Sequence, residues 1–249
     1  MSRIPIGLQL YSVRHDGARD LPGTLKAVAD MGYEGVEFYT FHGHTARELR
    51  QMLDAVGLRC CGTHIGLDAL LGERLPGTIA YALALGIPYL IVPGLPPERT
   101  SSPAAWRETA ALFADLAGKL KPHGLKTGYH NHDIEFRRVD GELPFDAFFG
   151  NTGPEVIMQV DLGNAIHGGG NPIACLRRYP GRAITIHLKE YSPDWVAPIG
   201  EGAVDWEQVF AICESTGGTD WYIVEHETEA YPVLWGVQRC LENLRKMGK

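Results

Sequence analysis

Short hydrophobic runs alternate along the chain with longer amphipathic segments. Each run spans four to six residues, which is the length of a buried strand. The amphipathic segments carry apolar residues at helical spacing, as residues 21–31 do. This alternation predicts repeated strand–helix units, which build a parallel sheet covered by helices.

Eight such units are expected. Strands are predicted at residues 6–11, 35–38, 58–63, 89–92, 126–129, 156–160, 183–186 and 221–224. Helices are predicted at residues 21–31, 45–56, 76–85, 102–121, 145–149, 172–178, 205–215 and 231–247. Eight units in 249 residues match the size of one closed barrel. The predicted fold class is therefore α/β, a single (β/α)8 TIM barrel domain formed by residues 1–249.

Capping residues support several of these helix boundaries. Thr45 and Glu48 have the spacing of a capping box at a helix start. Gly32, Gly57 and Gly86 each follow a predicted helix and precede a predicted strand, as glycine C-caps do. No glycine-rich phosphate loop follows the first strand, which argues against an open nucleotide-binding sheet.

Charge and composition narrow the possible partners. The formal net charge is −7 and no block of Lys or Arg occurs, so nucleic acid is not expected as a partner. The five cysteines are odd in number, and reduced, mostly buried thiols are expected. The first residues enter a strand without a signal-peptide segment, and no apolar run reaches the roughly 20 residues of a membrane span. A cytoplasmic protein without a membrane partner is predicted.

Residues able to bind a metal follow the last four predicted strands. The fifth strand runs into His130, the sixth into Asp161, the seventh into His187 and the eighth into Glu225. Because the carboxyl ends of barrel strands meet on one face, these side chains are expected to converge there. Imidazole and carboxylate donors that meet at one point predict a divalent metal site.

The same face is expected to carry further polar side chains. They are Glu37 after the second strand, His64 after the third, His132 and Glu135 after the fifth, Asn164 after the sixth, Lys189 and Glu190 after the seventh, and Glu227 after the eighth. Seven of the ten histidines lie at or just past strand ends, which predicts acid–base groups around the metal.

Several motifs at these strand ends resemble the sugar phosphate isomerase/epimerase family. They are residues 129–136 (YHNHDIEF), 160–164 (VDLGN), 187–190 (HLKE), 200–206 (GEGAVDW) and 223–225 (IVE), together with 6–12 (IGLQLYS) and 32–37 (GYEGVE). Each motif alone is weak, but their order and spacing cover nearly the whole chain. The resemblance implies a xylose isomerase-like barrel, in a subgroup with the YHNHxxEF pattern.

The resemblance also implies one divalent ion, manganese first, with magnesium, cobalt or zinc as alternatives. Asp161, His187 and Glu225 match the family's ligands at strands six, seven and eight. The fifth strand differs from the ketose epimerases, which have Glu-Asn where this chain has His130 and an asparagine. Either Glu135 curls back to supply the fourth ligand, which the intact YHNHxxEF pattern favours, or His130 binds the metal directly.

The positions of the polar residues along the chain suggest a role for each of them. Lys189 lies two residues beyond His187, so both point to the same side of the strand. The expected catalytic residues are His130, His132, Lys189 and His64; the expected substrate-binding residues are Glu37, Asn164 and Glu201; and the expected metal ligands are Glu135, Asp161, His187 and Glu225.

The predicted activity belongs to carbohydrate metabolism. A base, His130, His132 or Glu135, removes a proton next to the carbonyl of a keto sugar or related polyol, and an acid returns it. Return of the proton is isomerisation or epimerisation through an ene-diolate. The alternative is a lyase, which expels a β-hydroxyl or a glycosidic oxygen, like inosose dehydratases or enzymes that cleave 3-keto-glycosides.

Other classes fit the chain less well. Apurinic endonucleases share the barrel, but they need a more basic surface than this acidic chain has. A sugar-binding role without catalysis stays open, as do the oligomeric state, where a homo-oligomer is compatible, and the identity of the sugar or cyclitol. No Lys/Arg cluster suited to a phosphate is seen in the sequence, which favours an unphosphorylated substrate.

Overall fold

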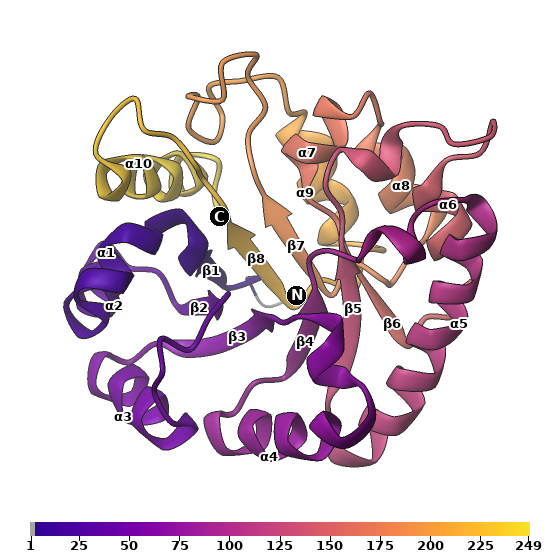
Figure 1. The fold of residues 1–249 in the computed structure, drawn as a ribbon. Coiled ribbons are helices and arrows are strands. Elements are labelled where there is room, and N and C mark those ends of the chain that lie inside the picture. Colours follow the sequence, from indigo (N-terminus) through magenta and orange to yellow (C-terminus); the bar gives the residue numbers. More distant parts are fainter. Residues whose placement is uncertain (1–2) are drawn as a thin grey trace.

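The computed structural model describes residues 3–249, and its eight strands form one parallel sheet (Figure 1). The strands are β1 (Ile6–Gln9), β2 (Gly35–Phe38), β3 (Arg59–His64), β4 (Tyr89–Val92), β5 (Lys126–His130), β6 (Val156–Gln159), β7 (Thr185–Leu188) and β8 (Trp221–Val224). Hydrogen-bonded neighbours follow the order β6-β5-β4-β3-β2-β1-β8-β7. Because β1 pairs with β8, the sheet curls into a barrel, which confirms the predicted (β/α)8 fold.

The helices lie outside the strands and surround them (Figure 1). They are α1 (Arg14–Arg19), α2 (Leu21–Met31), α3 (Ala46–Val56), α4 (Leu75–Leu85), α5 (Pro103–Leu120), α6 (Pro144–Phe149), α7 (Leu162–His167), α8 (Pro172–Arg178), α9 (Trp206–Cys213) and α10 (Val233–Lys246). Thr45 and Glu48 form the predicted capping box at the start of α3. Gly32, Gly57 and Gly86 end α2, α3 and α4 in the left-handed conformation.

Two short helices, α1 and α7, were absent from the sequence-based assignment. Each has six residues, too few for an apolar stripe to stand out along the sequence. The first strand also ends earlier than predicted, at Gln9. The side-chain carbonyl of Gln9 accepts a hydrogen bond from the Tyr11 backbone N–H and begins the 3-10 helix Leu10–Val13.

The barrel closes where β6 approaches β7. The contact is narrow: a parallel bridge joins Asp161 to His187, and the backbone N–H of His187 donates to the carbonyl of Val160 over 2.9 Å. A second backbone hydrogen bond joins β6 to the segment before β7: the N–H of Met158 donates to the carbonyl of Arg182 over 2.9 Å. Two residues that the sequence marked as metal-binding therefore face each other across this seam.

Alternation along the strands sorts side chains into layers inside the barrel. A separate apolar cluster fills the interior below the strand ends, formed by Cys61, Tyr89, Ile91, Ile157, Ile184, Trp221 and Ile223. Two residues beyond Ile157 and Ile223, on the same face, lie Gln159 at the end of β6 and Glu225 just after β8. The interior thus changes from apolar to polar toward the carboxyl ends of the strands.

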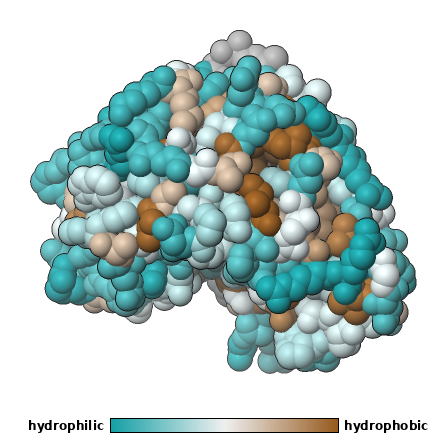
Figure 2. Space-filling model, turned by 90° about the horizontal axis from the view of Figure 1, so that it is seen from above, coloured by the Kyte–Doolittle hydropathy of each residue, from teal (hydrophilic) through white to brown (hydrophobic). Residues whose placement is uncertain are grey.

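The outer surface carries both hydrophilic and hydrophobic residues (Figure 2). On the face drawn in Figure 2, hydrophilic residues predominate and hydrophobic residues form small separate groups. Four of the five cysteines are buried, and Cys175 is half-buried. Among residues 3–249, no helix has both the length and the apolar character needed to cross a membrane.

Candidate functional site

Four buried side chains at the strand ends point their donor atoms at one another. They are His130 from β5, Asp161 after β6, His187 from β7 and Glu225 after β8, and their donor atoms all lie within 4.8 Å of one another. Asp161 Oδ2 is 4.0 Å from both His130 Nε2 and His187 Nδ1. We call these four residues the donor cluster. Two imidazoles and two carboxylates suit ions such as zinc and manganese.

Asp161 provides the clearest sign that a ligand belongs in this cluster. Its Oδ1 accepts a hydrogen bond from the Asn164 backbone N–H over 2.7 Å and caps helix α7. Its Oδ2 is buried and, within residues 3–249, has no hydrogen-bond partner. A buried oxygen left unpaired is costly, and a metal ion at this point would satisfy it. The donor cluster therefore fits a divalent ion.

His187 lies between two carboxylates. Its Nδ1 is 2.7 Å from Glu225 Oε2, and its Nε2 is 2.6 Å from Glu37 Oε2. Burial alone would lower the pKa of His187, but the charges and hydrogen bonds of Glu37 and Glu225 raise it to about 10. A cation in place of that proton would be stabilised by the same carboxylates.

The two carboxylates of the donor cluster have opposite pKa shifts. Burial raises the pKa of Asp161 to about 7, with Lys189 acting against it and Glu225 adding to it. Burial also acts to raise the pKa of Glu225, but Lys189 and His187 outweigh burial and hold it well below its usual range. Glu225 is therefore ionised at neutral pH, as a metal ligand must be.

A second polar layer lies directly beneath the donor cluster. Glu37 accepts hydrogen bonds from the side-chain amides of Gln9 and Gln159, over 2.8 and 2.9 Å. Gln159 also donates to Thr185 Oγ1 over 2.9 Å. These four residues are fully buried. Glu37, which was expected to bind substrate, is not among the residues that line the cavity, and its carboxylate contacts His187.

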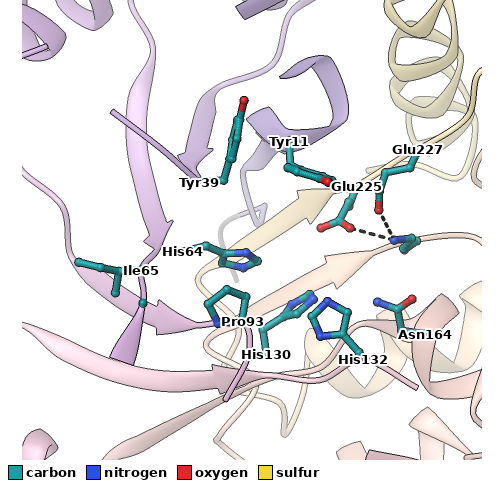
Figure 3. A pocket seen from close by; sticks show the side chains of 13 residues that line it. Tyr11, Tyr39, His64, Ile65, Pro93, His130, His132, Asn164, Glu225 and Glu227 are labelled. Atoms are coloured by element: carbon teal, nitrogen blue, oxygen red, sulfur yellow. Dashed lines mark hydrogen bonds and ion pairs between the residues drawn. The ribbon is translucent and has the colours of Figure 1, made fainter. Parts of the chain in front are cut away.

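A cavity of about 520 Å³ opens above the donor cluster (Figure 3). It is lined by Tyr11, Tyr39, His64, Ile65, Gly66, Pro93, Gly94, His130, His132, Asn164, Lys189, Glu225 and Glu227. In Figure 3 the rings of Tyr11 and Tyr39 lie across the cavity from His130 and His132. The structure thus brings the predicted His64, His130, His132, Asn164 and Lys189 to one cavity.

Lys189 is the one Lys or Arg among the described residues that line this cavity. Its Nζ donates to Glu225 Oε1 over 2.9 Å and to Glu227 Oε1 over 2.6 Å. Burial alone would lower the pKa of Lys189, but Glu225, Asp161 and Glu227 raise it above its usual value. Lys189 therefore stays charged, and its charge is balanced by two carboxylates.

Glu135, expected as the fourth metal ligand, is not part of the donor cluster. It lies in the 3-10 helix Ile134–Phe136, and its carboxylate contacts the preceding residues of its own segment. One oxygen accepts from the Tyr129 hydroxyl, and the other accepts from the His132 backbone N–H over 2.7 Å. Both oxygens are therefore occupied in shaping the loop, and the structure brings His130 to the cluster instead.

Asn131, between the two histidines of the fifth strand end, joins that end to the sixth. Its side-chain carbonyl accepts from the Asp161 N–H over 3.0 Å, and its amide donates to the Asp161 carbonyl over 3.2 Å. The YHNHxxEF pattern therefore combines one cluster residue, one cavity residue and the contacts that hold them.

Glu201, expected to bind substrate, does not line the cavity. Its carboxylate accepts from Arg239 Nε over 2.8 Å and from Asn243 Nδ2 over 2.9 Å, which ties the loop after β7 to helix α10. The buried side chain of Glu190 stabilises the same loop. It accepts hydrogen bonds from the Gly200 and Val204 backbone N–H groups. The GEGAVDW motif thus serves loop structure.

Sequence reasoning missed Gln9, Gln159 and Thr185. A usable signal was present: Gln159 lies two residues before Asp161 and Thr185 two before His187, so each shares a face with a cluster residue. A glutamine inside an otherwise apolar strand also needs buried partners.

The chain matches the model of the xylose isomerase-like TIM barrel family over residues 25–247. An inosose dehydratase from Erwinia tasmaniensis is 25% identical over 146 residues, which cover 50% of this chain and 48% of that enzyme. The aligned part therefore spans about half of the Erwinia enzyme's length. An inosose dehydratase from Geobacillus kaustophilus is 24% identical, with 84% of each chain covered.

Solved structures with similar folds include two of note. A sugar phosphate isomerase/epimerase from Parabacteroides distasonis superposes with a TM-score of 0.85 at 24% identity, covering 98% of this chain and 94% of the other. The IolI protein, whose crystal structure holds a zinc atom, has a TM-score of 0.75 at 15% identity, covering 98% and 97%. At these identities the likeness shows a shared fold.

Proposed function

Since the chain belongs to the xylose isomerase-like TIM barrel family, we propose that it is a divalent-metal-dependent enzyme acting on a keto sugar or related cyclitol. The proposed reaction is isomerisation or epimerisation through an ene-diolate. The observation that carries this proposal is the buried donor cluster with its unpaired Asp161 Oδ2, open to a cavity with acid–base side chains.

The ion proposed first is manganese, with zinc next because the IolI structure holds zinc. When bound, such an ion polarises a substrate carbonyl and stabilises negative charge on its oxygen. His130, Asp161, His187 and Glu225 would hold it. Lys189, hydrogen-bonded to Glu225, places a further positive charge beside the same part of the cavity.

The groups that exchange protons with substrate must lie in the cavity and outside the donor cluster. His64 meets both conditions, and burial lowers its pKa, so the ring is neutral at pH 7 and able to accept a proton. His132 and the Lys189–Glu227 pair line the same cavity. In Figure 3, His64 and Glu227 lie on opposite sides of Glu225. Two separate groups, one from β3 and one after β8, suit proton removal by one and proton return by the other.

The proposed substrate is unphosphorylated and uncharged. Lys189 is the single cation of the cavity lining among residues 3–249, and Glu225 and Glu227 already neutralise it. Phosphate binding uses arginine forks, lysines or free backbone N–H groups. Tyr11 and Tyr39 instead offer aromatic surface and hydroxyl groups, which suit the ring and hydroxyls of a sugar or cyclitol.

Dehydration is the second candidate, for a specific reason. At the end of β5 this chain has His130, and the carboxylates of the following loop have other partners: Asp133 pairs with Arg137, and Glu135 is bound to Tyr129 and the loop backbone. The site therefore has no strand-five carboxylate base among its described residues. The matching inosose dehydratases support the same reading, in which one base removes a proton and the substrate then loses water.

The experiment that separates the two candidates uses heavy water. The metal-loaded protein is incubated in D₂O with a panel of ketoses and with inosose, and the recovered compounds are analysed by mass spectrometry and NMR. Deuterium in a recovered sugar supports isomerase or epimerase chemistry, whereas loss of water supports the dehydratase. Neither change in any compound, with metal bound, would refute both candidates.

A further inference from the structure

Glu37 and Gln159, in the layer beneath the donor cluster, contact three histidines. Glu37 Oε2 lies 2.6 Å from His187 Nε2. Gln159 Oε1 lies 3.1 Å from His130 Nδ1 and 2.8 Å from His64 Nε2. Glu37 and Gln159 are fully buried, so the protein itself must satisfy these nitrogens.

We propose that Glu37 and Gln159 are positioning residues that set the tautomers of these three histidines. The inference rests on the metal centre of the proposed function and names the residues that decide which nitrogen of each ring is offered to the ion. A neutral imidazole has one N–H and one lone pair, and the partner of one nitrogen decides the state of the other.

The orientation of the Gln159 amide follows from its donors. Its Nε2 donates to Glu37 Oε1 and to Thr185 Oγ1, each over 2.9 Å. The reversed amide would place its carbonyl oxygen against the Glu37 carboxylate, where two acceptors repel each other. Gln159 Oε1 therefore faces the histidines and acts as an acceptor.

An acceptor at Gln159 Oε1 requires N–H groups on the rings that contact it. His130 must carry its proton on Nδ1, which leaves the lone pair on Nε2. That nitrogen is the atom 4.0 Å from Asp161 Oδ2, so it faces the donor cluster. His64 must carry its proton on Nε2, which leaves Nδ1 as the proton acceptor of that ring.

Glu37 does the same for His187. Its Oε2 also accepts from Gln9 Nε2 over 2.8 Å and lies 3.2 Å from His64 Nε2, so the carboxylate serves only as an acceptor. His187 must therefore carry a proton on Nε2. The second ring proton is then on Nδ1, 2.7 Å from Glu225 Oε2, and this is the proton that a bound ion would displace; its loss leaves the lone pair on Nδ1, which also faces Asp161. Both cluster histidines thus offer the nitrogen a metal requires.

The sheet is locally shaped to hold the Glu37 carboxylate. The register between β2 and β3 shifts between Val36 and Glu37, opposite Gly62. A Cβ atom at position 62 would lie 2.9 Å from Glu37 Oε1, closer than ordinary contacts allow. The bulge and the glycine together make room for this buried side chain.

The direct test is NMR of the zinc-loaded protein labelled with ¹⁵N-histidine. Long-range ¹H–¹⁵N spectra distinguish protonated, unprotonated and metal-bound ring nitrogens. The expected pattern is zinc on Nε2 of His130 and on Nδ1 of His187, with His64 protonated on Nε2. Zinc on the opposite nitrogen of either ring, or a His64 ring protonated on Nδ1, would overturn the proposal.

The second test compares two variants that change no charge. Gln159→Leu removes the amide that faces the histidines, and zinc affinity measured by chelator competition is expected to fall 10- to 100-fold. Thr185→Val removes a partner of the same amide but leaves Glu37 to orient it. Its zinc affinity is expected to change by less than about twofold. Equal losses in both variants, or none in Gln159→Leu, would contradict the tautomer role.

Failure of the inference and failure of the proposed function give different results. If wild-type protein binds no zinc or manganese, the metal-dependent function fails and the inference fails with it. If zinc binds at the donor cluster but the rings have other tautomers, only the inference fails. If Gln159→Leu does not fold, the spectra of the wild-type protein decide the question by themselves.

Discussion

Asp161 Oδ2 lies 4.0 Å from His187 Nδ1 across the seam between β6 and β7, and within residues 3–249 it has no hydrogen-bond partner. The contact between β6 and β7, where the barrel closes, therefore brings together the side chains of Asp161 and His187. These two side chains face each other without a hydrogen bond between them. Each is fixed from its other side, Asp161 by the Asn164 N–H and His187 by Glu37. This pre-organisation means that an ion can bind without first breaking the fold of the site.

Asp161→Asn should lower the amount of bound metal by at least tenfold, because an amide oxygen lacks the charge of the carboxylate. The asparagine side chain can still cap helix α7, so the fold should be kept. Elemental mass spectrometry of purified protein measures the bound metal. Asp205→Asn is the matched control, because Asp205 caps α9 through the Gln208 N–H in the same way but is exposed and is not part of the donor cluster. Equal metal content in Asp161→Asn and wild type would contradict the site.

Lys189→Met should abolish most turnover while leaving metal bound. The change removes the cation beside Glu225 and Glu227, so the cavity loses a group that can stabilise or protonate a substrate oxygen. A loss of about 100-fold or more in kcat is expected. Metal content should stay near the wild-type value, since all four cluster residues are unchanged and His187 still holds the pKa of Glu225 low.

Lys189→Arg provides the control for charge alone. It keeps a cation near the two carboxylates but changes its shape and proton affinity. Activity near wild type in Lys189→Met, measured with the substrate found in the D₂O screen, would show that Lys189 only pairs with its neighbours.

Glu135→Ala should destabilise the fold without removing the metal. The change leaves the Tyr129 hydroxyl and the His132 N–H without their buried acceptor, which costs about 1–3 kcal/mol. Urea unfolding measures the free energy, and elemental analysis of the folded protein measures the metal. Loss of metal from a variant that stays folded would restore Glu135 as a ligand.

Acid should weaken the fold through His226. This ring contacts the Tyr231 hydroxyl, and burial, with a contribution from Lys189, lowers its pKa to about 4. The unfolded chain binds the proton near pH 6.5, so the folded state loses stability as pH falls from about 6.5 to about 4. The full effect is about 3 kcal/mol.

His226→Asn removes this proton site and keeps the backbone N–H that donates to Ser12. The free energy of unfolding of the variant should therefore fall less steeply than that of wild type over the same pH range. The other buried histidines contribute equally to both proteins, so the difference isolates His226. Parallel curves would show that its ring does not titrate as described.

Much of the fold could be read from the chain. The strands at residues 35–38, 89–92 and 221–224 and helices α2 and α8 have the predicted limits, because hydrophobic periodicity and glycine or proline caps act locally. The convergence of Asp161, His187 and Glu225 also followed from local facts, since each lies at the end of a parallel strand.

The choice between His130 and Glu135 could not be read in this way. Both follow the fifth strand, and the sequence pattern favoured Glu135. The 3-10 turn at Ile134–Phe136 and the Tyr129 hydroxyl, from the strand itself, decide where that carboxylate lies. Contacts of this kind depend on side-chain packing, which strand-end position does not determine.

The sequence by itself determined the alternation of strands and helices, the barrel, and the set of polar residues at its carboxyl end, because backbone periodicity and chain length govern these. The tertiary structure alone decided which donors meet, which glutamate shapes a loop, and how Glu37 and Gln159 contact the histidines. The physical reason is that Glu37 and His187 are 150 residues apart, and a 2.6 Å contact between them exists only once the barrel has closed.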